Sequence, residues 1–403
     1  MDAASSSVDS LIANGGSERI RIALSVSDPE SFCTWFLALG RYDIDLFCFN
    51  PKWGEQEHSV AMDIARPHWV LGDFSDVGFE HTAGVEAKRG VDNIAVGLRL
   101  MIPTGGTSGK IRFTMHRWSS LSASVYGFQG LFNVNHVSSF CVVPLYHVSG
   151  FMQLIRALLT MGKVVFGSVD TFKEGHSVLA DAKERGCFLS LVATQLERLL
   201  RDEANVALLR GYRAIFVGGG PVPDSLLKKG IDLELPLAPT YGMSETAAQV
   251  ATMEPDAFLE GRTGQGKALP HARLSVVDDE GSLLKAGEVG RIQIAASSIF
   301  RGYYGEEERL VDSIVAPDLG SLDDFGNLTV IGRSDRVIIS GGEKIDLHEI
   351  ERVLEETRLV SDVFAFGLED SEWGSKLVLA YVPVAESTVD EELRVALRGK
   401  RSD

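Results

Sequence analysis

Between residues 20 and 246, the chain alternates short, almost wholly apolar segments with segments whose apolar residues recur every three or four positions. The first kind is typical of strands buried on both faces of a sheet, and the second is typical of helices with one apolar face. Asp28 and Pro29 predict the start of the first helix, because aspartate is a favoured N-cap and proline a favoured first residue. The alternation predicts an α/β fold of βαβ units around a largely parallel sheet. The expected strands are 20–26, 44–50, 140–146, 163–167, 187–193 and 214–220, and the expected helices begin near 28, 149, 176 and 194.

The pattern changes after Thr246. Two strand-like runs flank an Asp-Asp-Glu-Gly segment, which is a hairpin signal, so we expect a small antiparallel β subdomain over 268–332. From Ser334 the pattern reads strand, Gly-Gly turn, helix, two strands and a last helix. We therefore expect a large N-terminal domain, 1–333, that includes the β subdomain, and a small, mobile α+β lid domain, 334–403.

Composition and charge narrow the classes of function. Glycine makes up 41 of 403 residues, above the usual ~7%, which suggests many tight loops that approach a ligand with their backbone. The net charge of −17 argues against a nucleic-acid partner. The four cysteines show no CxxC spacing and lie in apolar runs, which favours buried thiols in a reducing compartment, the cytoplasm. We expect no secretory signal and no membrane span, because no apolar run approaches ~18 residues. Nothing indicates the oligomeric state.

The most informative loop is IPTGGTSGK, residues 102–110. Its glycines let backbone N–H groups approach anionic oxygens, and its hydroxyls add donors. A Walker-type P-loop is excluded, since only three residues separate Gly105 from Gly109 and an isoleucine follows Lys110. Taken alone, the loop is equally compatible with a surface turn and with a phosphate cradle.

Four further segments carry candidate chemistry: FVGGGPVP at 216–223, PTYGMSET at 239–246, PLYHVSG at 144–150 and IGRSDRVIISGGEKID at 331–346. A glutamate beside a phosphate loop can hold Mg²⁺ through a carboxylate oxygen, which makes Glu245 a candidate metal ligand. Each segment also has an ordinary interpretation. Glu245 alone fits a solvated or capping acid, His147 fits a core or cap residue, and 331–346 fits a solvated hairpin.

The order of these segments resembles the acyl-adenylate-forming superfamily, which includes acyl-CoA synthetases, luciferases and peptide-synthetase adenylation domains. TGGTSGKIRF resembles the family's phosphate loop, and the YGxSET and GRxD boxes match outright. The resemblance covers the chain from about residue 20 to its end. It implies ATP, Mg²⁺ and coenzyme A as cofactors, and a small carboxylic acid as substrate. The acid would first form an acyl-AMP, and a thiol would then displace AMP.

The resemblance also implies roles for individual residues. The phosphates would be held by the loop residues Thr104, Gly105, Gly106, Thr107, Ser108, Gly109 and Lys110. The adenine would be lined by Gly219, Gly220, Pro221 and Tyr241, with Gly242 and Ser244 in the same box. The remaining roles are Glu245 for Mg²⁺, Thr246 for the α-phosphate, Asp318 and Arg333 for the ribose, His147 for the acyl pocket, Asp335 for the interdomain hinge, and Gly341 and Gly342 for the pantetheine tunnel.

The chain departs from the family pattern at three places. Arg112 stands where the phosphate loop has a lysine, which keeps the positive charge with altered geometry. The segment before the loop is short. A C-terminal lysine that binds the reacting carboxylate in the family would fall beyond Asp403, so we expect the lid domain to be incomplete. Lys400 lies too close to Arg333 for that role, and we expect it to be a solvated residue at a helix end.

The short N-terminal part, PLYHVSG and SGGEKID are most similar to the o-succinylbenzoate–CoA ligases of menaquinone and phylloquinone synthesis. This similarity implies an aromatic keto-diacid as substrate. Three alternatives stay open: another aryl- or fatty-acyl-CoA synthetase, an adenylating module that loads a carrier protein, and a non-catalytic protein that keeps the nucleotide pocket.

Overall fold

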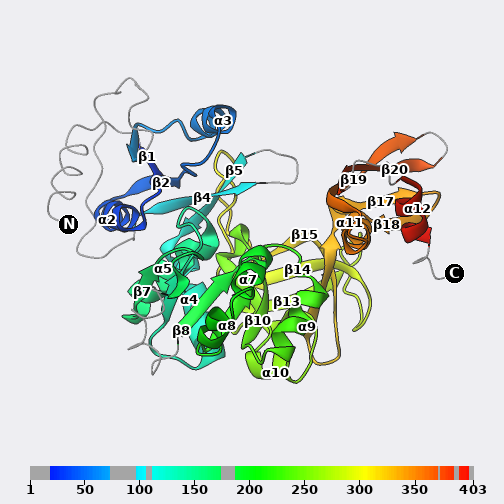
Figure 1. The fold of residues 1–403 in the computed structure, drawn as a ribbon. Coiled ribbons are helices and arrows are strands. Elements are labelled where there is room, and N and C mark those ends of the chain that lie inside the picture. The colour runs from blue at the N-terminus through cyan, green and yellow to red at the C-terminus, as the bar shows by residue number, and fades with distance from the viewer. Residues whose placement is uncertain are drawn as a thin grey trace. The chain divides into compact units, whose positions relative to one another are not determined.

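The computed structural model describes residues 19–72, 97–105, 111–173, 187–370, 373–384 and 390–398. Its internal contacts divide the chain into two compact units, which are described separately (Figure 1). The first unit comprises residues 1–274, 293–314 and 323–329, and the second comprises 275–292, 315–322 and 330–403. The expected boundary after residue 333 stays a prediction.

One sheet of the first unit has five strands in the order β3-β1-β2-β4-β5. The first four strands by sequence are mutually parallel, and β5 returns antiparallel to β4. The loop expected to hold phosphates joins β4 to β5, and its residues 106–110 lie outside the described residues. The strands are β1 (Ile20–Ser25), β2 (Ile44–Cys48), β3 (Trp69–Gly72), β4 (Arg99–Gly105) and β5 (Ile111–Arg117).

The first helix, α2 (Pro29–Leu39), begins where its capping residues predict. The Asp28 carboxylate accepts a 2.8 Å hydrogen bond from the backbone N–H of Ser31, which satisfies one of the unpaired donors of the first turn. α3 (Glu55–Ala65) follows β2.

The second sheet has eleven strands in the order β13-β14-β15-β16-β12-β11-β10-β9-β8-β6-β7. Strands β6 to β10 pair in parallel, whereas β11 and β12 are antiparallel to their neighbours. The contact division assigns parts of β13 to β16 to the second unit. The strands are β6 (Ser138–Cys141), β7 (Val164–Phe166), β8 (Cys187–Leu191), β9 (Ala214–Val217), β10 (Leu237–Met243), β11 (Ala248–Thr252), β12 (Gly266–Ala268), β13 (Ala272–Val277), β14 (Gly290–Ala296), β15 (Ser313–Leu322) and β16 (Asn327–Arg333).

Most of the expected elements are present, with one clear difference. The strand expected over 140–146 ends at Cys141, because the chain turns at Pro144, whose carbonyl accepts the N–H of His147 at 3.2 Å. The turn brings His147 to the N-cap of α5 (Val148–Thr160). The helix expected near 176 lies outside the described residues.

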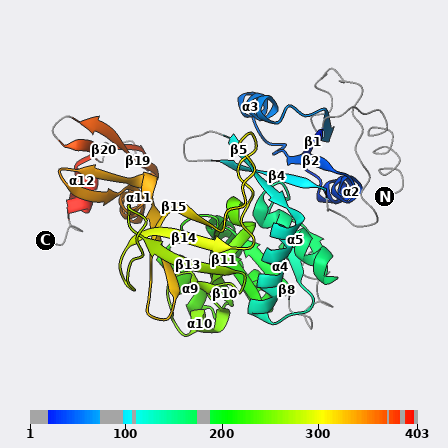
Figure 2. The same ribbon diagram turned by 180° about the vertical axis from the view of Figure 1, so that it is seen from behind.

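The parallel strands of the second sheet alternate their side chains between two helical layers. Phe188 of β8 and Phe216 of β9 face α4 (Trp118–Phe132), where they meet Phe128 and Phe132. The intervening residues, such as Leu189 and Ile215, face the opposite helices. Figure 1 shows those helices in front of the strands, and Figure 2 shows α4 and α5 from behind. They are α7 (Ala193–Leu199), α8 (Glu203–Leu209), α9 (Asp224–Asp232) and α10 (Pro255–Leu259).

Helix α5 is buried almost all round, because it packs against both sheets. Phe151 lies edge-on to Phe36 of α2, with ring centroids 5.0 Å apart, and belongs to the core that includes β1, β2 and β4. The same helix contacts β6, β7 and β11 of the second sheet. Gly150 is required at its start, since a Cβ there would lie 2.2 Å from the carbonyl oxygen of Pro144.

The second unit contains a four-stranded sheet in the order β18-β17-β20-β19 and two helices. α11 packs on β19, and the small core contains Leu354, Val360, Val363 and Leu393. The elements are β17 (Val337–Ser340), β18 (Glu343–Asp346), α11 (Leu347–Glu356), β19 (Val360–Asp370), β20 (Gly374–Pro383) and α12 (Asp390–Arg398).

The aromatic cluster around Phe188 is expected to dominate the stability of the first unit. Phe188 is 1% exposed and stacks on Phe216 at 5.8 Å, so Phe188→Ala leaves a cavity and should lower the free energy of unfolding by about 3–5 kcal/mol. Urea unfolding followed by circular dichroism measures this loss. Phe325→Ala is the matched control, because that ring is 76% exposed. Equal small effects of both changes would contradict the assigned core.

Candidate active site

The carboxyl ends of four neighbouring strands bring the predicted site segments to one edge of the second sheet. β6, β8, β9 and β10 are adjacent and parallel, so the segments that follow them leave the same edge. The segments after β6 and β9 carry His147 and Gly219–Pro221, the end of β10 carries Tyr241 and Gly242, and the turn after β10 carries Ser244–Thr246. In open α/β sheets this edge is where ligands bind.

Glu245 lies on a tight turn, η2 (Ser244–Thr246), between β10 and β11. Every backbone carbonyl of the turn accepts a hydrogen bond from a residue distant in the sequence. The side chain of Glu245 is buried, with 8% of the residue exposed. The turn is therefore held from several directions. The bonds run from His116 Nε2 to the Ser244 carbonyl (2.7 Å), from the Phe300 N–H to that of Glu245 (2.8 Å), from Ser298 Oγ to that of Thr246 (2.8 Å), and from Ser124 Oγ to that of Ala247 (2.7 Å).

The clamped turn holds a strained backbone. Ala247 and Ala248 have φ values of 50° and 82°, a conformation that costs alanine of order 1–3 kcal/mol per residue. Gly242 lies against the same backbone, since a Cβ at its position would be 2.1 Å from the carbonyl oxygen of Ala248. The glycine of the YGxSET box is thus required by close approach of two backbone segments.

The Glu245 carboxylate is oriented by Tyr303, a residue that the sequence analysis missed. Tyr303 Oη donates a 2.6 Å hydrogen bond to Glu245 Oε1, and the Arg112 guanidinium lies 3.9 Å from the centroid of the Tyr303 ring. Burial, followed by the nearby carboxylate, raises the pKa of Tyr303, so the hydroxyl stays protonated and donates. The structure therefore brings together two predicted residues, Glu245 and Arg112, through a third.

Glu245 fits the expected magnesium ligand. Tyr303 occupies Oε1, and no described residue bonds to Oε2. An oxygen donor beside phosphates is the ligand type that Mg²⁺ prefers, with water and phosphate oxygens completing the coordination. Within the described ranges, no three His, Cys, Asp or Glu side chains form a metal cluster.

His116 is the second residue that the sequence analysis missed. Its ring is fully buried, and the carbonyl of Ser244 only accepts hydrogen bonds, so Nε2 carries the proton and Nδ1 lies 3.1 Å from Ser120 Oγ. Burial lowers the pKa of His116 to about 4, so the ring is uncharged at neutral pH. A neutral imidazole thus anchors the turn of Glu245.

Thr246 has its hydroxyl turned to the backbone. Thr246 Oγ1 lies 3.0 Å from the carbonyl oxygen of Met243 and 2.7 Å from that of Ala248, and it accepts the N–H of Met243 at 3.1 Å. Its role toward an α-phosphate stays a prediction.

The glycine segment after β9 lies beside the YGxSET box. β9 and β10 are paired, and a Cβ at Gly218 would lie 2.9 Å from the carbonyl oxygen of Thr240. Gly219 has a φ of +81°, which glycine adopts readily. The buried Tyr241 lies within β10, two residues before its end. This is the adjacency expected of a site for a flat base.

The other predicted residues are distributed as follows. His147 caps α5 at the same sheet edge, exposed at the surface, and the atoms packed around its ring lower its pKa by desolvation. Thr104 and Gly105 end β4, whereas Gly106 to Lys110 and Lys400 lie outside the described residues. Asp318, Arg333, Asp335, Gly341 and Gly342 belong to the second unit.

A buried polar cluster lies behind the site, and the sequence analysis assigned no role to its central residue. Arg156 on α5 is 2% exposed, donates to Gln249 Oε1 at 2.8 Å and lies over the ring of Phe128 at 4.2 Å. No described carboxylate pairs with it. Burial lowers the pKa of Arg156 to about 9, so it still carries a charge at neutral pH.

Polar atoms without partners surround this charge. Arg156 Nε, Gln153 Oε1, Gln249 Nε2 and both ring nitrogens of His271 are buried and bond to no described residue. Gln249 is the cross-strand partner of Gly242, so the cluster adjoins the YGxSET box. A buried charge and buried donors without partners are costly, and a polar, anionic ligand would satisfy them.

Comparison with known proteins finds a matching family model and curated relatives. A family model described as AMP-binding enzyme matches residues 95–304. A 2-succinylbenzoate–CoA ligase of Listeria monocytogenes is 33% identical over 308 residues, which are 72% of this chain and 61% of that protein. The ligase of the same name from Bacillus licheniformis is 33% identical over 302 residues, covering 72% and 60%. The chain thus spans about three fifths of the length of these curated relatives.

Solved structures confirm the expected α/β fold. The o-succinylbenzoate CoA synthetase of Bacillus subtilis, in complex with its acyl-adenylate OSB-AMP, has a TM-score of 0.81 at 23% identity over 100% of this chain and 86% of that one. ATP-bound MatB from Rhodopseudomonas palustris has a TM-score of 0.79 at 20% identity over 99% and 86%. No described helix is both long and apolar enough to cross a membrane.

Protonation of His116 should make the first unit acid-sensitive. Unfolded histidine takes up a proton near pH 6.5, but folded His116 does so only near pH 4, so between these values the unfolded state binds more protons. Stability therefore falls as the pH drops from 6.5 to 4, by on the order of 3 kcal/mol for this residue. His116→Gln keeps an N–H donor without titrating and should flatten the profile. Parallel urea-unfolding profiles of the two proteins over this range would contradict the assignment.

Proposed function

The chain belongs to the AMP-binding enzyme family, and from that membership we propose that it is an AMP-forming acid–thiol ligase. It activates a carboxylic acid with ATP as acyl-AMP and transfers the acyl group to coenzyme A. The family match over 95–304 and the geometry around Glu245 support this reaction. The named activity of the relatives and the buried Arg156 cluster support o-succinylbenzoate as the acid.

In the first step, the acid's carboxylate attacks the α-phosphorus of ATP, and pyrophosphate leaves. Such transfers depend on positioning and charge neutralisation, not on a protein nucleophile. Glu245, oriented by Tyr303, would hold the Mg²⁺ that neutralises the phosphates. Arg112 adds a positive charge at the start of β5, next to the loop that joins β4 to β5. Gly219–Pro221 and Tyr241 would receive the adenine.

The single observation that supports a diacid is the unpaired charge of Arg156. Its helix, α5, begins at His147, which we assign to the edge of the acyl pocket. A monocarboxylic acid has no second anion to offer once its carboxylate reacts. An aromatic keto-diacid has one, together with a carbonyl oxygen that can accept from the donors of Gln249 and His271. The second carboxylate would then compensate the buried guanidinium.

The remaining roles stay proposals from family membership. They are the phosphate contacts of residues 104–110, the α-phosphate contact of Thr246, the ribose contacts of Asp318 and Arg333, the hinge at Asp335, and the pantetheine contacts of Gly341 and Gly342. We assign the reaction to the cytoplasm, because the four cysteines are free thiols, as is usual in a reducing compartment.

Removing the charge of Glu245 should impair the first step. Glu245→Gln keeps the shape and the hydrogen bond from Tyr303 but weakens Mg²⁺ binding, so pyrophosphate release should fall about 10²–10³-fold. Circular dichroism checks that the variant is folded. Rising Mg²⁺ should partly restore the rate of the variant. Near wild-type adenylation by a folded variant would remove Glu245 from the site.

Arg156 should distinguish a diacid from a monoacid. Pyrophosphate release is measured with o-succinylbenzoate, with 4-oxo-4-phenylbutanoate, which lacks the ring carboxylate, with benzoate and with a medium-chain fatty acid, and CoA-thioester formation follows. We expect the diacid to have the highest kcat/KM. Arg156→Leu should lower that value about 10²–10³-fold, because it removes one partner of a buried charge pair, and should leave the rate with 4-oxo-4-phenylbutanoate nearly unchanged.

Arg198→Leu, on an exposed arginine paired with Asp170, controls for the loss of a surface charge. A preference for the fatty acid would overturn the diacid assignment and leave the ligase class intact. Adenylation without transfer to CoA would indicate a carrier protein as the acceptor. Absence of pyrophosphate release with every acid would overturn the proposed activity.

A further inference from the structure

The hydrogen bond from Tyr303 to Glu245 limits how this carboxylate can bind a metal ion. Tyr303 Oη donates to Glu245 Oε1 at 2.6 Å, whereas no described residue bonds to Oε2. We propose that Tyr303 is a positioning residue that confines Glu245 to one metal-binding oxygen, so that the site selects Mg²⁺ over Ca²⁺. This rests on the assignment of Glu245 as the metal ligand in the proposed function.

Glu245 has the surroundings of a carboxylate that receives a cation. It is 8% exposed, and no described lysine, arginine or histidine forms an ion pair with its side chain. The tyrosine hydroxyl is a neutral donor, so it satisfies one oxygen but leaves the negative charge without a counter-ion. Because an unpaired buried charge is costly, a cation at Oε2 would stabilise the carboxylate.

The ring of Tyr303 is held in the position from which its hydroxyl meets Glu245. The Arg112 guanidinium lies over the ring, 3.9 Å from its centroid, and the ring of Phe300 meets it edge-on at 5.0 Å. The backbone of Tyr303 also forms an antiparallel bridge with Thr114 of β5. The hydroxyl therefore leaves Glu245 only if these contacts are disturbed.

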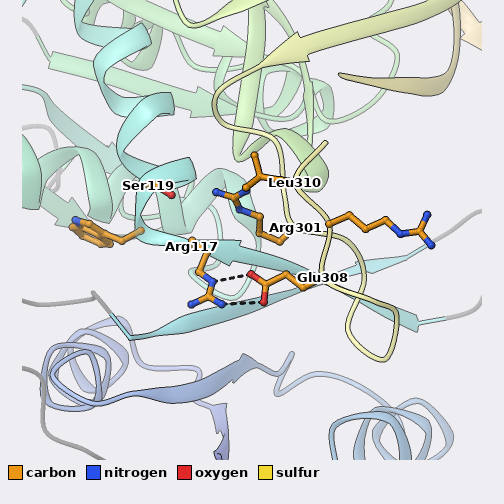
Figure 3. Close-up of a pocket in the computed structure, with 7 residues that line it drawn as sticks. Arg117, Ser119, Arg301, Glu308 and Leu310 are labelled. Carbon is orange, nitrogen blue, oxygen red and sulfur yellow. Dashed lines mark hydrogen bonds and ion pairs between the residues drawn. The ribbon is translucent and has the colours of Figure 1, made fainter. Parts of the chain in front are cut away.

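The segment between β14 and β15 holds Glu245 at two points. The N–H of Phe300 donates to the backbone carbonyl of Glu245 at 2.8 Å, and Tyr303, three residues later, donates to the side chain. Further along the segment, Glu308 accepts hydrogen bonds from Arg117 of β5 at 3.0 and 2.9 Å, a pair that Figure 3 shows. One segment, itself anchored to β5, thus fixes both the backbone and the carboxylate of Glu245.

A carboxylate with one free oxygen discriminates between Mg²⁺ and Ca²⁺. Ca²⁺ takes about six to eight oxygen ligands and can bind both oxygens of one carboxylate, whereas Mg²⁺ keeps a tight octahedral shell of waters, phosphate oxygens and few carboxylates. To bind Glu245 through both oxygens, Ca²⁺ must displace the Tyr303 hydroxyl from Oε1. The loss of a hydrogen bond to a charged group lowers affinity by a factor of about ten or more. Mg²⁺ needs only Oε2 and leaves this bond intact.

Calorimetry of ATP binding tests the proposal without turnover, because no acyl-adenylate forms when the acid is left out. The full chain is titrated with ATP in saturating Mg²⁺ and, separately, in saturating Ca²⁺, and the ratio of the two dissociation constants is compared between variants. We expect wild type to bind Mg·ATP more tightly than Ca·ATP. Tyr303→Phe removes the hydroxyl but keeps the ring under Arg112, and should reduce this preference about tenfold, chiefly by tightening the binding of Ca·ATP.

Tyr304→Phe is the matched control. The Tyr304 ring packs edge-on to Phe47 at 4.8 Å and its hydroxyl bonds to no described residue, so the ratio should stay at the wild-type value. Circular dichroism checks the fold of each variant. A purely structural role for Tyr303 would change the binding of both complexes equally. An unchanged ratio in folded Tyr303→Phe, or equal affinities for the two complexes in wild type, would therefore overturn the proposal.

Glu245→Gln separates this proposal from the proposed function. It should weaken the binding of both metal complexes and lower pyrophosphate release. If Glu245→Gln has both effects while Tyr303→Phe leaves the ratio unchanged, only the selectivity proposal is overturned. If folded Glu245→Gln changes neither binding nor pyrophosphate release, Glu245 is not the metal ligand, and the assignment fails together with the proposal.

Discussion

The hydrogen bonds to the turn between β10 and β11 are the constraint on which the site depends. The carbonyls of Ser244 to Ala247 each accept a hydrogen bond from a residue distant in the sequence. The donors are His116 at the end of β5, Ser124 on α4, and Ser298 and Phe300 in the segment between β14 and β15. Those bonds offset the left-handed backbone of two alanines, a conformation that isolated alanine avoids. As a result, the two sheets and the helix between them converge on one buried carboxylate.

Helix α5 has a comparable role for the acid. It is buried against both sheets, so it carries few polar residues, and those it carries have few polar neighbours. Among the described residues, Arg156 bonds to the amide of Gln249 and lies over the ring of Phe128, and no carboxylate pairs with it. A buried guanidinium without an ionic partner does not favour folding stability. Replacing such a group with an apolar side chain of similar volume is often neutral or stabilising. In the proposed function, this charge is half of an ion pair whose other half is the substrate.

In the first sheet, ion pairs also join residues that are distant in the sequence. Asp45 is buried and accepts from both Arg19 and Arg99, and Arg99 also lies near Glu308, which Arg117 holds. This chain of alternating charges ties the end of the β4–β5 hairpin to the segment that also supplies Tyr303.

Local sequence determined the elements and the segments that follow them. The Asp28 cap, the alternating apolar runs and the glycines after β9 and in the YGxSET box encode backbone geometry within a few residues, so periodicity and motif spacing identify them. Only the tertiary structure decided which side chains complete the site. Tyr303 meets Glu245 across 58 residues, Arg156 meets Gln249 across 93, and His116 meets Ser244 across 128. No local pattern encodes such pairs, because burial and partner choice arise when the strands assemble.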